Sequence, residues 1–232
     1  MKRRLVKVIV VLVILLAAAA GAFWWFVLRD DAPPEAALPD RTVPTTTDDS
    51  VAQSADGTWT VQPGEEVFVG YRIEEQFAGD TFNSTAVGRT PVVEGSLVVA
   101  GTEVPQVEID ADVTALESDN GRRDNFIRDR GLETTAFPAA TFRLTEPLTL
   151  PAAPGIGVVV ETVARGQLEL HGVLRDVEIP VEARWNGDTI DVTGSLPIVL
   201  ADYGIERISI PLVTIAENGV LEFQLTFVRA DA

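Results

Sequence analysis

The sequence predicts an all-β fold over residues 56–232, an antiparallel barrel or sandwich of about eight strands. Two observations lead to this expectation: short runs in which apolar and polar residues alternate, and turn signals between the runs. In one run, Val107 and Ile109 alternate with Glu108 and Asp110. The predicted strands lie at 59–61, 67–73, 95–99, 107–113, 140–144, 158–170, 173–185, 189–200 and 220–228.

The turn signals divide the domain into hairpins. Asn186-Gly187 and Asn218-Gly219 are strong hairpin signals, because both residues tolerate the positive φ of a type I′ turn. Further turns are expected at Ala100-Gly101, at 151–157 and at His171-Gly172. The alternating positions hold many small and medium side chains, which leaves a hollow barrel and a filled sandwich both open.

One segment, residues 118–132, breaks the β pattern. It carries four arginines, and Ile127 is its single β-branched residue. Phe126, Ile127 and Leu132 would form one apolar side of a short helix, with Ser118 or Asp119 as its N-cap. We therefore expect one short helix across an end of the barrel.

Residues 1–28 are predicted to form a basic cytoplasmic tip and a transmembrane anchor. Residues 8–28 carry no charge, and as a helix they would span about 31 Å, close to the hydrocarbon core of a bilayer. The basic residues before this run place the N-terminus in the cytoplasm and the barrel outside. The alternative is a signal peptide cleaved within 17–22, although Trp24 and Trp25 extend the apolar run past that point.

Residues 29–55 are rich in Asp, Pro, Thr and Ala, and they are predicted to form a disordered acidic linker. A flexible coil of these 27 residues would have a root-mean-square reach of about 29 Å.

Charge and composition exclude several classes of function. The net charge of −17 disfavours nucleic acid as a partner. The chain has no cysteine and one histidine, His171, which excludes disulfides, thiolate chemistry and multi-histidine metal sites. Asp110, Asp112, Glu117 and Asp119 fit the spacing of no calcium loop. No nucleophile elbow or nucleotide-binding glycine motif occurs, so we expect no enzyme and no cofactor.

Several short pieces occur in an order and spacing typical of one family. They are Trp59-Thr60-Val61, Val69-Gly70-Tyr71-Arg72, Ala86-Val87-Gly88-Arg89-Thr90, Glu94-Gly95-Ser96-Leu97, Ser118-Asp119 with Arg122-Arg123-Asp124, Phe137-Pro138-Ala139-Ala140-Thr141-Phe142, Gly166-Gln167-Leu168-Glu169-Leu170-His171-Gly172-Val173, Ala201-Asp202-Tyr203-Gly204-Ile205 and Leu221-Glu222-Phe223. With these pieces, residues 59–229 resemble the YceI-like lipid- or polyisoprenoid-binding proteins.

The resemblance implies an extended, lipocalin-like, eight-stranded antiparallel barrel that is periplasmic or secreted and carries a long isoprenoid or other amphiphilic chain. Two positions depart from the family pattern. Leu200 stands where many relatives have an arginine, and Gly131-Leu132 replaces a phenylalanine pair. Both positions bear on the recognition of a ligand headgroup.

The candidate ligand-binding residues are Arg122, Arg123, Asp124, Phe126, Phe137, Phe142, His171 and Tyr203. An arginine at the barrel mouth would hold a polar headgroup, whereas the alternative is an ion pair that pins the helix onto the barrel. The expected partners are a lipid or isoprenoid ligand, the membrane through the N-terminal helix, and a second copy in a homodimer. The alternatives are a structural or interaction module on a membrane stalk and, less favoured, a hydrolase that uses His171.

Overall fold

The structure is a computed structural model that describes residues 13–14, 16–18, 21, 32–41, 54–77, 82–206, 209–210 and 213–230.

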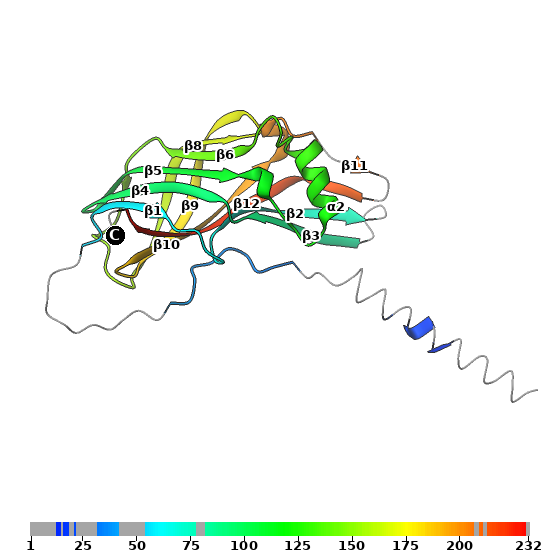
Figure 1. Cartoon of the computed structure of the whole chain (residues 1–232), viewed down its shortest axis with the longest axis horizontal. Helices are drawn as coiled ribbons and strands as arrows, with labels where there is room; N and C mark the ends of the chain where they lie inside the picture. The colour runs from blue at the N-terminus through cyan, green and yellow to red at the C-terminus, as the bar shows by residue number, and fades with distance from the viewer. Residues whose placement is uncertain are drawn as a thin grey trace, which may run out of the picture.

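Eight strands form a closed antiparallel barrel, which confirms the predicted fold class (Figure 1). Around the ring they are β1 (Gly57–Val61), β4 (Val93–Ala100), β5 (Glu103–Asp112), β6 (Ala139–Leu144), β8 (Val159–Leu170), β9 (Val173–Trp185), β10 (Thr189–Val199) and β12 (Val213–Arg229). The ring closes because β12 pairs with β10 along one edge and with β1 along the other.

A hairpin of β2 (Phe68–Phe77) and β3 (Phe82–Thr90) extends the wall beside β1. β2 pairs with the first part of β12, and β1 pairs with its last residues, so both lie along the same edge of the longest strand. Two short strands, β7 (Leu148–Thr149) and β11 (Ser209–Ile210), pair with β5 and β12. β3 is not among the strands predicted from the sequence.

The predicted turns are confirmed at four positions and wrong at one, and the first of the four is the loop 151–157 between β7 and β8. Asn186-Gly187 joins β9 to β10, Gly101 follows β4, and His171 and Gly172 take positive φ angles of 53° and 71° between β8 and β9. Asn218-Gly219, predicted as a hairpin, instead lies inside β12, where the register with β2 shifts between Ile215 and Gly219. The Asn-Gly pair forms a bulge here because strands β10 and β2 on both sides hold the chain extended.

The predicted helix is present as α2 (Gly121–Phe126), which continues into a π-helical turn, η3 (Ile127–Gly131). Its N-cap is Asn120 and not Ser118 or Asp119, since Asn120 Oδ1 accepts hydrogen bonds from the backbone of Arg122 and Arg123. Two 3₁₀ turns, η2 (Val113–Ala115) and η4 (Leu200–Tyr203), complete the structure near this end of the barrel. We call this the α2 end, and the opposite end, with the loop 150–158, the loop end.

The predicted anchor, residues 8–28, lies mostly outside the described residues. Those that are described, at 13–14, 16–18 and 21, are helical. Within the described part of the chain, no helix has the length and apolar character needed to cross a membrane. Residues 32–41, within the predicted linker, are extended and lie along the outer wall of the barrel, where they are drawn in blue in Figure 1.

Candidate functional site

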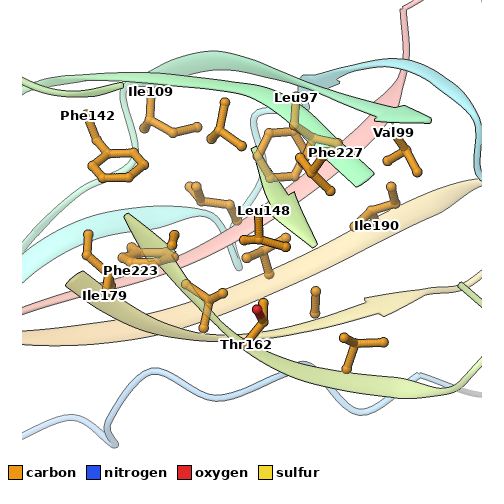
Figure 2. Close-up of a pocket in the computed structure, with 18 of the residues that line it drawn as sticks. Leu97, Val99, Ile109, Phe142, Leu148, Thr162, Ile179, Ile190, Phe223 and Phe227 are labelled. Atoms are coloured by element: carbon orange, nitrogen blue, oxygen red, sulfur yellow. The ribbon is translucent and has the colours of Figure 1, made fainter. Parts of the chain in front are cut away.

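The interior of the barrel holds an apolar cavity, which we call chamber one. Alternation along the strands directs one face of each strand inward, and on β12 these inward residues are Leu221, Phe223, Leu225 and Phe227. The chamber has a volume of about 160 Å³. Its labelled side chains converge from facing walls on a common space, and Thr141 and Thr162 are the hydroxyl residues among the described lining residues (Figure 2).

Two glycines make room for aromatic rings in this wall. A Cβ at Gly166 would lie 2.6 Å from the ring of Phe142, and one at Gly194 would lie 2.6 Å from the ring of Phe223. Both rings therefore pack directly over a glycine of a neighbouring strand, in space that a larger residue there would occupy.

A second chamber of about 100 Å³ continues the cavity toward the α2 end. Val69, Ala140 and Leu221 line both chambers, so the two are adjacent. Ile127 and Leu132 of the helical segment border chamber two. Burial raises the pKa of Tyr71, which also lines this chamber.

The volumes limit what the barrel holds in this conformation. An apolar cavity of about 150 Å³ takes one benzene ring, and chamber one, at about 160 Å³, is of that size. An isoprene unit has five carbons, so each chamber accommodates a short piece of a chain. A longer chain must run through both chambers and either widen the barrel or emerge at an end.

Arg123, a predicted headgroup ligand, is held in a charge cluster at the α2 end. Its Nε and Nη2 donate to the two carboxylate oxygens of Glu75 at 2.8 and 2.9 Å, and its Nη1 donates to Asp119. The hydrogen bonds to Glu75 raise the pKa of Arg123 further above its ordinary value. This two-pronged pair attaches α2 to β2, which is the pinning role weighed as the alternative.

Its neighbours on α2 differ in exposure. Asp124 is buried, and its Oδ1 accepts hydrogen bonds from the Ser118 backbone N–H at 3.0 Å and hydroxyl at 2.6 Å. Arg122 is exposed, and Phe126 is half-buried. Arg128, in η3, donates to the carbonyl of Leu116 at 2.9 Å and so attaches η3 to the chain that precedes α2.

His171, Phe137 and Tyr203 form a separate group beside the helix. The ring of Phe137 meets the imidazole edge-on with centroids 4.7 Å apart. His171 Nδ1 lies 3.0 Å from the carbonyl oxygen of Tyr203 and therefore donates to it, while Nε2 lies 3.3 Å from Glu133. Tyr203 is buried in the core, and burial raises its pKa.

Among the predicted site residues, Phe142 lines chamber one. Arg122, Arg123, Asp124, Phe126, Phe137, His171 and Tyr203 lie outside the described lining of both chambers. Sequence reasoning missed most of the lining because it singled out charged and aromatic residues, whereas the cavity is built from Val, Leu, Ile and Ala. The inward-facing positions of the alternating strands were the sequence signal that could have identified these lining residues. Across the described ranges, no three metal-ligating side chains gather in one place.

A closed antiparallel barrel around an apolar cavity is the architecture of the lipocalin-like barrels. The model of the YceI-like domain matches residues 59–227, and the chain belongs to this family. A search of the curated proteins gave no match.

Two solved structures share the fold. A polyisoprenoid binding domain from Saccharophagus degradans, implicated in plant cell wall breakdown, is 18% identical with a TM-score of 0.57, covering 74% of this chain and 98% of that domain. BcnA from Burkholderia cenocepacia is 17% identical with a TM-score of 0.53, covering 72% of this chain and 98% of BcnA.

Proposed function

We propose that this protein is an extracytoplasmic carrier that holds a polyisoprenoid or another long-chain amphiphile in the barrel cavity. The observation that carries the proposal is the lining of chamber one, where apolar side chains from facing walls surround a hollow of about 160 Å³. Each CH₂ group that leaves water for such a lining contributes about 0.8 kcal/mol. A hydrocarbon chain therefore binds through burial alone and needs few polar contacts.

The solved relative from Saccharophagus degradans is described as polyisoprenoid binding, which supports this class of ligand. The basic N-terminal tip and the uncharged run 8–28 support a single-pass anchor that leaves the barrel outside the cytoplasmic membrane. With Arg123 engaged by Glu75 and Asp119, Arg122 on the exposed side of α2 becomes the candidate for contact with a headgroup.

The alternatives receive less support from the geometry. A structural module on a stalk needs no interior space, yet the barrel is hollow. A hydrolase that uses His171 would need the imidazole to face a bound substrate, yet its Nδ1 is engaged by the Tyr203 carbonyl and the ring lies outside both chambers.

Native mass spectrometry of the full-length protein, purified in detergent from its own host, tests the proposal. We expect a copurified lipid that Ala183→Phe removes, because Ala183 lines chamber one and the added ring occupies the space of the chain. Ala152→Phe is the matched control, since Ala152 is exposed in the loop 150–158. The carrier proposal would be refuted if the wild type carried no lipid, or if Ala183→Phe retained it.

A second variant addresses the headgroup. Arg122→Ala should weaken retention of a lipid with an anionic head several-fold and leave a neutral lipid unaffected, because it removes a charge without touching the cavity. Equal retention of both lipids by Arg122→Ala would remove Arg122 from the site.

A further inference from the structure

The outer wall of the barrel carries two buried carboxylates on a face where alternation would place solvent. Glu222 is 2% exposed and Asp191 is fully buried, yet both lie on strands whose opposite face lines chamber one. A buried carboxylate is stable only when hydrogen bonds and opposite charges surround it. Part of that surrounding comes from residues 32–41, which we call the strap.

At its first residues the strap contacts β2, β3 and β12. Arg89 donates to Glu222 through Nε at 3.0 Å and Nη2 at 2.7 Å, and the same Nη2 donates to the carbonyl of Pro34 at 2.5 Å. Arg72 donates to the carbonyl of Pro33 at 2.7 Å, and its Nε lies 3.5 Å from Glu222. The backbone N–H of Ala36 donates to the other oxygen of Glu222 at 3.3 Å. The two arginines thus bridge the carboxylate and the strap.

At its last residues the strap contacts β9 and β10. Arg41 donates to both oxygens of Asp191, through Nε at 2.7 Å and Nη2 at 3.0 Å, and Arg184 donates to the carbonyl of Pro39. Pro39 is buried. Although burial by itself would raise the pKa of Asp191, hydrogen bonds from Arg41, Thr226 and Asn186 bring it below its ordinary value. Five side chains, which we call the outer-wall site, receive the strap: Arg72, Arg89, Arg184, Asp191 and Glu222.

We propose that the outer-wall site is a docking site for the chain's own strap, and that docking holds the barrel in one orientation with its α2 end toward the membrane. This rests on the anchored carrier proposed above. The strap runs from Arg72 and Arg89, on the hairpin that extends toward the α2 end, to Asp191 and Arg184 near the loop end (Figure 1). The chain therefore enters the strap from the α2 end.

Docking also shortens the tether. The uncharged run ends at Leu28 and the strap begins at Ala32, so three residues separate them. Three residues and their flanking bonds span at most about 14 Å, whereas a free linker of 27 residues reaches about 29 Å and lets the barrel turn in all directions. With the strap docked, chamber two and Arg122 lie nearest to the bilayer.

Two single-cysteine probes measure the orientation, because the chain has no cysteine of its own. Ala136→Cys lies beside the α2 end and Ala153→Cys at the loop end, and both positions are exposed. The full-length protein is placed in phosphatidylcholine nanodiscs that carry a headgroup acceptor dye, and each cysteine carries a donor dye. Since β12 alone has 17 residues, roughly 55 Å of strand, we expect energy transfer to be several-fold stronger at Ala136→Cys than at Ala153→Cys. Equal transfer would overturn the proposal.

Inserting one flexible segment at two places separates docking from a free linker. Twenty Gly/Ser residues, with a reach of about 25 Å, are inserted either between Asp31 and Ala32 or between Thr46 and Thr47. A docked strap predicts that the first insertion abolishes the difference between the probes and the second preserves it. If both insertions act alike, the strap is part of a free linker and the proposal is wrong.

Lipid content, measured by native mass spectrometry on the same samples, keeps the two proposals distinct. We expect both insertion variants to retain the lipid of the wild type, because neither changes the cavity. Absence of lipid from every sample together with a persistent orientation difference would refute the carrier and leave the docked strap in place. Retained lipid without any orientation difference would do the reverse.

Discussion

The two faces of β12 are both buried, but by opposite chemistry. On the inward face, Leu221, Phe223 and Leu225 line an apolar cavity, which a bound hydrocarbon chain would fill. Outward, Glu222 and Thr226 on the same strand are 2% and 7% exposed, and charged and hydrogen-bonding groups of the wall and the strap surround them. A polar outward face on an alternating strand is therefore not necessarily a solvated one.

The largest effect is expected from Glu222→Ala on the outward face. The change leaves Arg89 and Arg72 without their shared carboxylate, and removing one partner of a buried ion pair costs about 3 to 5 kcal/mol. We expect about 3 kcal/mol, since both arginines are partly exposed. Guanidinium unfolding of the full-length protein, followed by circular dichroism, measures the loss. Gln224→Ala, on the same face, should cost less than about 1 kcal/mol, and equal losses would contradict the special role of Glu222.

Leu225→Ala on the inward face should lower the free energy of unfolding by about 2 to 3 kcal/mol, because it removes apolar contacts and enlarges chamber one. This loss is somewhat smaller than the one expected from Glu222→Ala. The same unfolding measurement applies. Native mass spectrometry should still find lipid in this variant, since the chamber gains space and remains apolar. If Leu225→Ala released the strap, as detected by the cysteine probes, the two faces of β12 would not be independent.

Arg41→Lys keeps the charge at the end of the strap but loses the fork that contacts both oxygens of Asp191. We expect docking to weaken by about 1 kcal/mol, which is roughly a fivefold rise in the undocked population. Trypsin cleaves after either residue, so cleavage after position 41 should accelerate by about that factor. Glu35→Ala changes an exposed residue of the strap and serves as the control. Equal rates in Arg41→Lys and the wild type would show that the fork does not hold the strap.

The inward face was predictable from the sequence, and the outward face was not. The alternation of Leu221, Phe223 and Leu225 along a strand defines a buried side without knowledge of any partner. The burial of Glu222 depends on Arg72 and Arg89, more than 130 positions away, and on a proline-rich segment whose composition is typical of a linker. No local pattern encodes such a meeting of distant segments.

Local signals were also overridden within the strands and the helix. Asn218-Gly219 is a hairpin signal by propensity, yet pairing of β12 with β10 and β2 converts it into a bulge. The arginines of 118–132 correctly indicated a departure from β structure. The role of Arg123 depended on Glu75, a residue of β2 that lies beyond the predicted strand 67–73. The short helix and the barrel could be predicted, whereas the ion pairs that join them could not.

The smallest expected effect is the dependence of strap docking on pH. It distinguishes control of docking by Asp191 from control by another titrating group. The groups around its carboxylate are Arg41, Arg184, Asn186 and Thr226, with Glu66 on the far side of Arg41. Because hydrogen bonds from Arg41, Thr226 and Asn186 hold the pKa of Asp191 below the ordinary value of about 3.8, its contribution is complete above that value and is lost as the pH falls through the lowered pKa. The energy-transfer difference between Ala136→Cys and Ala153→Cys should therefore be unchanged between about pH 7 and pH 5 and should decline only below about pH 4. A decline between pH 7 and pH 5 would show that a group other than Asp191 controls docking, since the carboxylate stays charged throughout that interval.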